Sequence, residues 1–323
     1  MTDSPTRIQP QTVLHLPTMR TPRDIGPLAG RTVVVTGGSS GIGAAAVRQL
    51  ATLGAQLVVL GLEPDAVAAT AAQVGGHPIA VDYARFADVR RAADEIAALC
   101  PRIDVLINNA GGIFPGAVIT EDGHDLTVQV NHLAPFLLTR LLLPNLIAAP
   151  GSRVIVTSSL VNATGRIDLT DLNRARRRAG SYRMYSDSKL MNILFVRELA
   201  RRTAMGGPTA VAVHPGLIRS NLGLDAWYTR NLYHRPMRRL ARGSTSPENG
   251  ARPLVAAVTR PDPHTVNGAY LHRFTRGDRL LTAPQARDHD LARRLWDLSS
   301  SLVGLTGDPG IAAPMAHRLT AGG

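Results

Sequence analysis

The chain has 323 residues, 44% of them apolar and 19% charged, so it is long enough for one large domain or two smaller ones and too apolar for wholesale disorder. A single cysteine, Cys100, excludes an intrachain disulfide, and neither a clean membrane span nor a secretory signal is evident, so we expect a cytoplasmic protein. The net charge of +12 would fit a nucleic-acid or acidic-lipid partner. The arginine runs at 174–178 and 235–242, however, are not accompanied by a nucleic-acid-binding motif. We therefore expect no nucleic-acid partner and interpret both runs as solvated surface charge.

Short apolar runs alternate with helix-compatible segments from residue 31 onward. The runs predict strands at residues 32–36, 56–60, 78–81, 105–108, 153–158 and 209–213. The other segments predict helices at residues 44–53, 65–73, 89–99, 125–143, 185–202, 250–258 and 286–302. Strands that alternate with helices form βαβ units, and near-continuous apolar strands are buried on both faces. The sequence therefore predicts an α/β fold, a Rossmann-type doubly wound parallel sheet.

Three stretches fall outside this pattern. Residues 1–30 are rich in proline and threonine and predict an extended leader. Residues 217–247 carry arginine and aromatic residues without a sustained period, and a loop of that length is usually a lid or disordered. Residues 306–323 follow the last predicted helix as a tail. We therefore expect a single Rossmann domain at 31–305, with the lid and a C-terminal helical appendage.

A glycine-rich turn joins the first strand to the first helix. Its sequence is Thr36-Gly37-Gly38-Ser39-Ser40-Gly41-Ile42-Gly43. The glycines at 37, 41 and 43 permit a tight turn, let backbone N–H groups approach a pyrophosphate, and let the helix pack close to its strand. In the first βαβ unit, this turn predicts a dinucleotide site.

A tyrosine and a lysine begin the helix after the fifth strand. Lys189 follows Tyr185 by four positions, so both lie on one helical face. A nearby ammonium stabilises a phenolate, and a pKa depression of about three units, about 4 kcal/mol, would bring the phenol into the range of general acid–base catalysis. Lys189 is the only lysine among 36 basic residues, which indicates that this position needs a property that arginine lacks.

These motifs, in this order, resemble the short-chain dehydrogenase/reductase superfamily. The resemblance rests on the TGxxxGxG turn, on Asn108-Asn109-Ala110-Gly111 after the fourth strand, and on the YxxxK pair. The stretch from His214 to Leu222, the segment from Ser159 to Asn173, and the stretches Ser246–Ala251 and Leu291–Trp296 are similar to the retinol dehydrogenase and WW-domain-containing oxidoreductase branch.

The resemblance implies roles for particular residues. Tyr185 would transfer the proton, Ser159 would orient the substrate oxygen, and Lys189 would lower the phenol pKa and hold the nicotinamide ribose. Asn131 would bind a water of the proton relay. The implied cofactor site comprises Gly37, Ser39, Ser40, Gly41, Ile42, Gly43, Glu63, Asp82, Tyr83, Asn109, Ala110, Gly111, Tyr185, Lys189, Pro215 and Gly216. For Asp82 a role as a helix cap or turn residue stays open.

Cofactor choice departs from both family patterns. The second strand is followed by Gly61-Leu62-Glu63, with neither the arginine of NADP-preferring members nor the strand-end aspartate of NAD-preferring ones. Glu63 would accept from a ribose hydroxyl and repel a 2′-phosphate, which favours NAD, although a solvated loop charge is an equal alternative. The cofactor is therefore NAD or NADP, and no metal is expected.

We accordingly expect an oxidoreductase that interconverts an alcohol and a ketone or aldehyde on a lipophilic small molecule. The expected substrate-binding residues are mostly apolar: Ile113, Phe114, Leu160, Val161, Leu217, Trp227, Tyr228 and Tyr233. Those that belong to the lid, from Leu217 onward, would alternatively pack in the core or at a dimer contact. Related enzymes are often homodimers or homotetramers. One alternative is a non-catalytic dinucleotide sensor that binds a partner through its arginine-rich surface. Another is an enzyme that acts on an acidic or nucleotide-linked substrate.

Overall fold

A computed structural model describes residues 26–173, 180–217, 245–278 and 280–305 of the chain. Most of the expected leader, most of the expected lid and the tail at 306–323 lie outside the described residues. Within the described part, no helix combines the length and the apolar character needed to cross a membrane.

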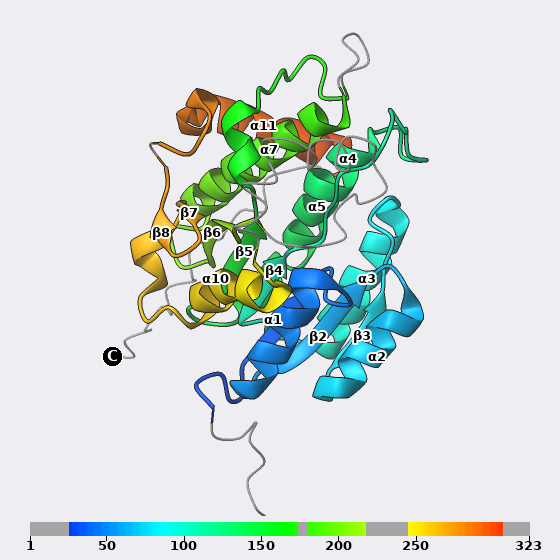
Figure 1. Cartoon of the computed structure of the whole chain (residues 1–323), viewed down its shortest axis with the longest axis vertical. Helices are drawn as coiled ribbons and strands as arrows, with labels where there is room; N and C mark the ends of the chain where they lie inside the picture. The colour runs from blue at the N-terminus through cyan, green and yellow to red at the C-terminus, as the bar shows by residue number, and fades with distance from the viewer. Residues whose placement is uncertain (1–25, 174–179, 218–244, 279, 306–323) are drawn as a thin grey trace, which may run out of the picture.

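One eight-stranded sheet forms the centre of the molecule, in the order β3-β2-β1-β4-β5-β6-β7-β8 (Figure 1). Its strands are β1 (Thr32–Val35), β2 (Gln56–Gly61), β3 (His77–Ala80), β4 (Val105–Asn108), β5 (Arg153–Thr157), β6 (Thr209–His214), β7 (Tyr270–His272) and β8 (Thr275–Arg276). All neighbouring pairs are parallel except β7 with β8. The order reverses direction between β1 and β4, which is where open α/β sheets bind ligands beyond the carboxyl ends of their strands.

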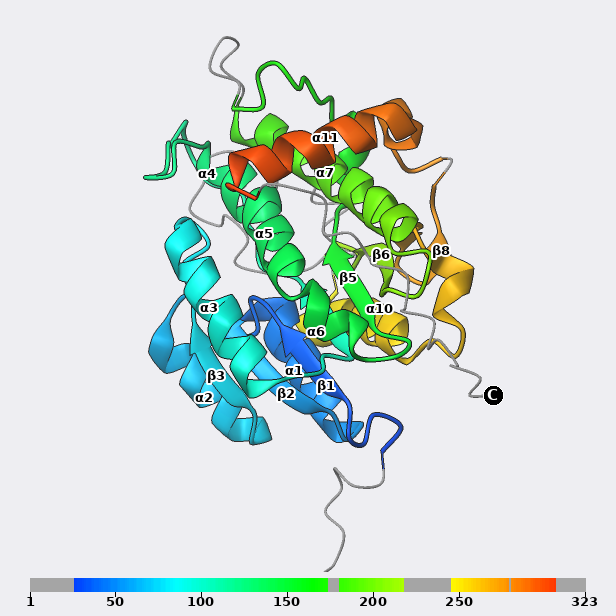
Figure 2. The same ribbon diagram turned by 180° about the vertical axis from the view of Figure 1, so that it is seen from behind.

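Helices cover both faces of the sheet (Figures 1 and 2). One face packs against α1 (Gly41–Thr52), α2 (Pro64–Val74) and α10 (Pro247–Thr259). The other packs against α3 (Phe86–Leu99), α5 (Ala134–Leu141) and α7 (Ser181–Arg202). The C-terminal helix α11 (His289–Leu302) lies across α7 on the side away from the sheet. The predicted doubly wound Rossmann-type fold is confirmed.

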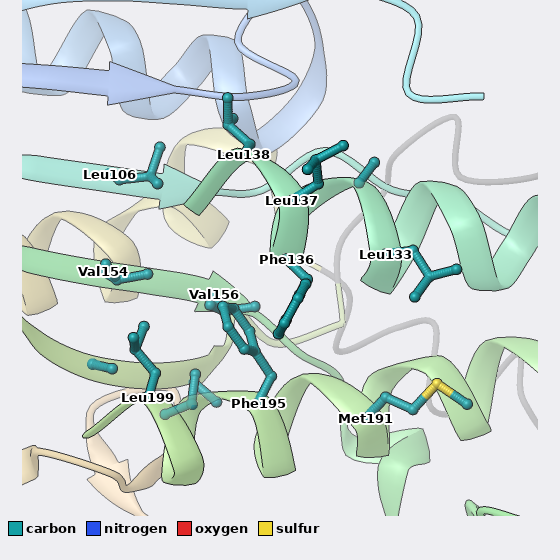
Figure 3. Packing of buried hydrophobic residues seen from close by; sticks show 14 of the residues in the cluster. Leu106, Leu133, Phe136, Leu137, Leu138, Val154, Val156, Met191, Phe195 and Leu199 are labelled. Atoms are coloured by element: carbon teal, nitrogen blue, oxygen red, sulfur yellow. The ribbon is translucent and has the colours of Figure 1, made fainter. Parts of the chain in front are cut away.

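The core between the sheet and α5 and α7 is almost entirely apolar. Figure 3 shows Phe136 of α5 and Phe195 of α7 meeting above the strand residue Val156, and their ring centroids lie 5.4 Å apart. Trp296 of α11 completes this cluster, 5.0 Å from the Phe136 ring and 5.9 Å from the Phe195 ring. Edge-to-face and offset pairs of this kind add about 0.5–1.5 kcal/mol each to the burial of apolar area. The cluster therefore fixes α7, which carries Tyr185 and Lys189.

The segment predicted as one helix at 125–143 changes its winding along its length. It consists of α4 (Leu126–Val128), a π turn (Gln129–Leu133), α5 and α6 (Leu143–Ile147). Asp125 caps its start by accepting hydrogen bonds from the backbone N–H groups of Thr127 and Val128. The π turn inserts an extra residue into the ladder, and such turns occur frequently at functional sites.

Two strands and several short helical turns were not predicted. β7 and β8 have three and two residues, too few for a periodic apolar signal. The short helical turns that were not predicted are the 3-10 turns η3 (Leu160–Thr164), η4 (Pro263–Val266) and η5 (Pro284–Arg287). The last of these occupies the start of the helix predicted at 286–302, so α11 begins at His289 instead.

Candidate active site

The glycine turn is a close-packed cradle at the carboxyl end of β1. Gly37 and Gly41 adopt positive φ angles of 63° and 51°, a conformation in which glycine avoids the clash of a Cβ. A Cβ on Gly43 would lie 1.9 Å from the carbonyl oxygen of Gly37. At Gly41 the space is open, and both Ser40 and Gly41 are exposed at the N-terminus of α1. The turn therefore leaves backbone N–H groups accessible at a helix N-terminus, as a pyrophosphate requires.

The segment after β4 is hydrogen-bonded directly to this cradle. The Thr36 hydroxyl accepts from the backbone N–H groups of Asn109 and Ala110, both at 3.0 Å. The Asn109 side chain donates to the carbonyl of Thr36 at 3.2 Å and accepts from the Thr157 hydroxyl at 3.3 Å. Asn109 thus ties together the ends of β1, β4 and β5, the three strands on which the candidate site is built.

Asn131 is fully buried in the π turn, and its amide clamps the loop after β4. Its Oδ1 accepts from the backbone N–H of Gly112 at 2.8 Å, and its Nδ2 donates to the Gly112 carbonyl at 2.9 Å. Nδ2 also donates to the hydroxyl of Ser188 on α7 at 3.1 Å. These bonds satisfy an amide that would otherwise be costly to bury. The side chain is therefore a positioning group, and its implied part in a water relay stays a prediction.

Ser159, Tyr185 and Lys189 converge at the ends of β5 and α7. Ser159 caps η3, and its hydroxyl lies close enough to the Tyr185 phenol to act on the pKa of that phenol. The Lys189 ammonium lies 5.3 Å from the centroid of the Tyr185 ring and donates to the Thr157 carbonyl at 3.2 Å. Tyr185 and Lys189 are both buried. The geometry places a phenol between a serine hydroxyl and a cation, as the spacing of four predicts.

The electrostatics of the pair differ from the expectation. Burial raises the pKa of Tyr185 to about 12, although the hydrogen bond from Ser159 acts in the opposite direction. Burial also lowers the pKa of Lys189 to about 8. The expected depression of the phenol pKa is therefore wrong for the protein alone. The pKa is raised because desolvation of the phenolate outweighs the attraction of the Lys189 ammonium, which lies over the face of the Tyr185 ring.

The comparisons with known proteins agree with this geometry. The family model of the short chain dehydrogenases matches residues 31–229. Retinol dehydrogenase 14 of Mus musculus is 37% identical over 302 residues, covering 87% of this chain and 88% of its own.

The chain belongs to the short-chain dehydrogenase family.

Two further similarities fill out that membership. Polyprenol dehydrogenase of Mus musculus is 36% identical over 299 residues, covering 88% of each chain. A short chain dehydrogenase from Burkholderia cenocepacia, solved in complex with NADP, superposes with a TM-score of 0.60 at 27% identity and covers 76% of this chain and 97% of its own. Membership makes the chain an enzyme that acts on CH–OH groups with NAD or NADP.

The adenine end of the dehydrogenase site is only partly defined. Glu63 is exposed at the start of α2 and makes no capping hydrogen bond, so its carboxylate is free to meet a ribose. Asp82 accepts from the backbone N–H of Ala84 at 2.8 Å, which is the turn role left open above. Tyr83 is buried in the apolar core, so any contact of this residue with adenine would come from its backbone.

The predicted substrate-binding residues fall into two groups. Those that the structure describes lie at the carboxyl ends of β4, β5 and β6, and all are half-buried or exposed: Ile113, Phe114, Leu160, Val161 and Leu217. Trp227, Tyr228 and Tyr233 lie outside the described residues. Pro215 is buried, whereas Gly216 has a φ of 105° and is half-buried directly after β6.

Four residues that position the site were not among the predicted site residues. Thr36, Gly112, Thr157 and Ser188 each make a hydrogen bond that positions one of the predicted residues. Thr36 and Thr157 stand at strand ends, Thr36 beside the glycine turn and Thr157 beside Ser158. A hydroxyl at such a place is a reasonable indication of a residue that positions the site. Gly112 holds Asn131, and Thr157 holds Lys189, through backbone atoms, which no residue pattern reveals. No group of three or more potential metal-ligating side chains gathers within the described ranges.

We expect Gly43→Ala to lower stability by about 1–3 kcal/mol and to weaken nucleotide binding, because the new methyl group would overlap the Gly37 carbonyl and displace the turn. Thermal unfolding and a titration of NADH fluorescence measure the two effects. Gly180→Ala is the matched control, since a Cβ there meets nothing within 4 Å. Unchanged nucleotide affinity in Gly43→Ala would contradict the assignment of the glycine turn as the nucleotide-binding site.

Proposed function

We propose that this dehydrogenase interconverts an alcohol and a ketone or aldehyde on a lipophilic small molecule, with Tyr185 as the general acid and base. The observation that carries the proposal is the convergence of Ser159, Tyr185 and Lys189 beside the glycine cradle at the carboxyl ends of the strands. Retinol and polyprenol, named in two relatives, are lipophilic alcohols, and the exposed apolar side chains Leu160 and Leu217 beside the site are compatible with such a substrate.

Each residue has a definite task in this mechanism. In carbonyl reduction Tyr185 donates its proton to the substrate oxygen, and its high pKa keeps that proton on the phenol at neutral pH. Ser159 donates a hydrogen bond to the same oxygen. In alcohol oxidation Tyr185 must first lose its proton, so its pKa has to fall, and the Lys189 ammonium favours the phenolate.

The cofactor site fits a nicotinamide dinucleotide. The cradle at Gly37 and Gly43 has no room for a Cβ, and α1 presents its N-terminus there. When bound, the nicotinamide supplies or accepts the hydride. The Lys189 ammonium lies close to the Gly111 backbone and is hydrogen-bonded to Thr157 at the end of β5. These two residues would hold the nicotinamide end of the cofactor.

We expect NADH to be used in preference to NADPH, because the Glu63 carboxylate would repel a 2′-phosphate. Glu63→Arg should reverse the preference by at least about tenfold in kcat/KM, through the exchange of a repulsive for an attractive charge. Asp65→Arg, an exposed charge reversal on the same helix, is the control. A wild-type enzyme that prefers NADPH would contradict this assignment.

The proposed function is tested by assaying lipophilic alcohols and carbonyl compounds with NADH and with NADPH side by side. We expect turnover with at least one cofactor and one compound class, at a rate that depends on Tyr185. Nucleotide binding without turnover across the panel would instead favour the non-catalytic sensor. Light scattering on the same sample tests the predicted homodimer or homotetramer.

A further inference from the structure

The carboxyl end of β7 lies on the same edge of the sheet as the candidate active site. Val213 pairs with Thr157 of β5, and His214 of β6 pairs with His272 of β7. Neighbouring strands are about 4.8 Å apart, so the end of β7 lies about 10 Å from the end of β5. The turn that follows β7 therefore borders the place where a substrate would bind.

Arg273 occupies that turn in an unusual conformation. Its φ is 58°, and no other non-glycine residue in the described ranges has a positive φ. The backbone N–H of Arg273 donates to the His214 carbonyl at 2.9 Å. A bulky side chain is disfavoured in the left-handed region, where glycine is the usual choice. The position thus retains an arginine at a conformational cost.

The guanidinium group of Arg273 has no acidic partner among the residues described. No ion pair joins it to a carboxylate in the described ranges, the residue is exposed, and its guanidinium carbon lies 5.9 Å from the centroid of the Phe274 ring. Its Cδ and Nε approach Gly216, 3.8 Å from where a Cβ on that glycine would lie. The arginine side chain therefore extends from β7 across the end of β6 toward the active site.

The buried imidazole of His214 adds no charge to this corner. The rings of His214 and His272 lie 5.2 Å apart, and His214 is buried with no hydrogen-bond partner on its Nδ1. Burial, His272 and Arg273 together lower the pKa of His214 to about 4, so His214 is neutral at physiological pH. The guanidinium of Arg273 thus carries a positive charge that no carboxylate of the described residues balances, beside the exposed ring of Phe274.

We propose that Arg273 binds a carboxylate of the substrate, about 10 Å from the reacting carbon. The inference rests on the proposed function and narrows its substrate class to amphiphilic oxo or hydroxy acids. A planar guanidinium pairs with a carboxylate through two parallel hydrogen bonds, and one guanidinium balances one negative charge. The cofactor's pyrophosphate is a poor alternative, because β7 is four strands from the glycine turn, about 19 Å away.

The test compares a medium-chain oxo acid, whose carboxyl lies about 10 Å from its carbonyl carbon, with its methyl ester. For the wild type we expect kcat/KM for the acid to exceed that for the ester by about tenfold or more, the factor of a charge-assisted hydrogen bond. Arg273→Gln should reduce this ratio to near one. Arg252→Gln, which removes an exposed charge from α10, is the control and should keep the wild-type ratio.

A second variant and a binding measurement distinguish failure of the Arg273 proposal from failure of the proposed function. Arg273→Gly removes the guanidinium and suits the positive φ, so it should lose the acid preference with a thermal midpoint no lower than the wild type. Calorimetry should give a Kd for the acid about tenfold higher in Arg273→Gln than in the wild type. An unchanged ratio, or an unchanged Kd, would overturn the role of Arg273. Absence of turnover with both compounds, alongside the expected shift in Kd, would count against the proposed function alone.

Discussion

Tyr185→Phe is expected to lower kcat by about a hundred- to ten-thousandfold, the range that a positioned proton donor contributes. Ser159, whose hydroxyl acts on the phenol pKa, is only half-buried, so removal of the phenol hydroxyl leaves no deeply buried group unpaired. The fold and the nucleotide affinity should therefore remain. Steady-state kinetics, thermal unfolding and an NADH titration measure the three quantities.

Tyr182→Phe is the matched control for this experiment. Tyr182 lies on the same helix, one turn earlier, and 43% of its surface is exposed. Its phenol makes a minor contribution to the raised pKa of Tyr185, so turnover should stay within a few-fold of the wild type. A Tyr185→Phe enzyme as active as Tyr182→Phe would remove the proposed mechanism while leaving the family membership untouched.

Lys189→Arg is expected to reduce kcat by about a hundredfold or more although it conserves the charge. Lys189 is buried, its ammonium donates to the Thr157 carbonyl, and Gly111 lies close beside it. A planar guanidinium is larger and cannot occupy this space with the same geometry. Kinetics with the arginine variant, and with Lys189→Met as the charge-free reference, measure the effect.

The arginine variant also tests why the chain has a single lysine. If Lys189→Arg were as active as the wild type, charge alone would suffice, and the lysine would have no chemical explanation. If it were as inactive as Lys189→Met, the shape and the hydrogen-bond geometry of the ammonium would be the decisive properties. An NADH titration of each variant separates loss of nucleotide binding from loss of the proton-transfer step.

The magnitude of the phenol pKa shift shows why one cation is not enough for alcohol oxidation. Lowering the pKa from about 12 to near 7 requires about 7 kcal/mol. Two charges about 5 Å apart at an effective dielectric constant of about 20 interact by about 3 kcal/mol, or roughly two pKa units. Lys189 is already present in the protein whose Tyr185 pKa is about 12, so a further positive charge is needed. One such charge at that distance, which an oxidised nicotinamide would supply, would lower the pKa by about two units.

The sequence predicted the parts of the fold whose signal is local. Strands such as 105–108 and 209–213 are buried on both faces, so their apolar runs are nearly continuous, and the structure has them at Val105–Asn108 and Thr209–His214. β7 and β8 are too short for any period to appear. The π turn around Asn131 was also missed, because the winding of a helix follows from tertiary hydrogen bonds rather than from its apolar pattern.

The candidate site was predictable where side chains of distinctive chemistry stand at fixed spacing. Tyr185 and Lys189 fall on one helical face, and the glycines cluster at one turn. The clamp of Asn131 on Gly112 was not predictable, since its partner is a backbone. The direction of the Tyr185 pKa was wrong for a similar reason, because burial depends on everything packed around the phenol. Arg273 gave no signal, since one arginine among so many is unremarkable until its φ is known.

The acidity of the Tyr185 phenol is the central quantity of this account, and it can be titrated directly. The ultraviolet difference spectrum between the wild type and Tyr185→Phe isolates the ionisation of this one tyrosine. We predict a pKa of about 12 in the protein alone and a fall of about two units or more on addition of NAD⁺ or NADP⁺. A phenol whose pKa stays above 10 with the oxidised cofactor bound, in an enzyme that oxidises alcohols at neutral pH, would contradict the account.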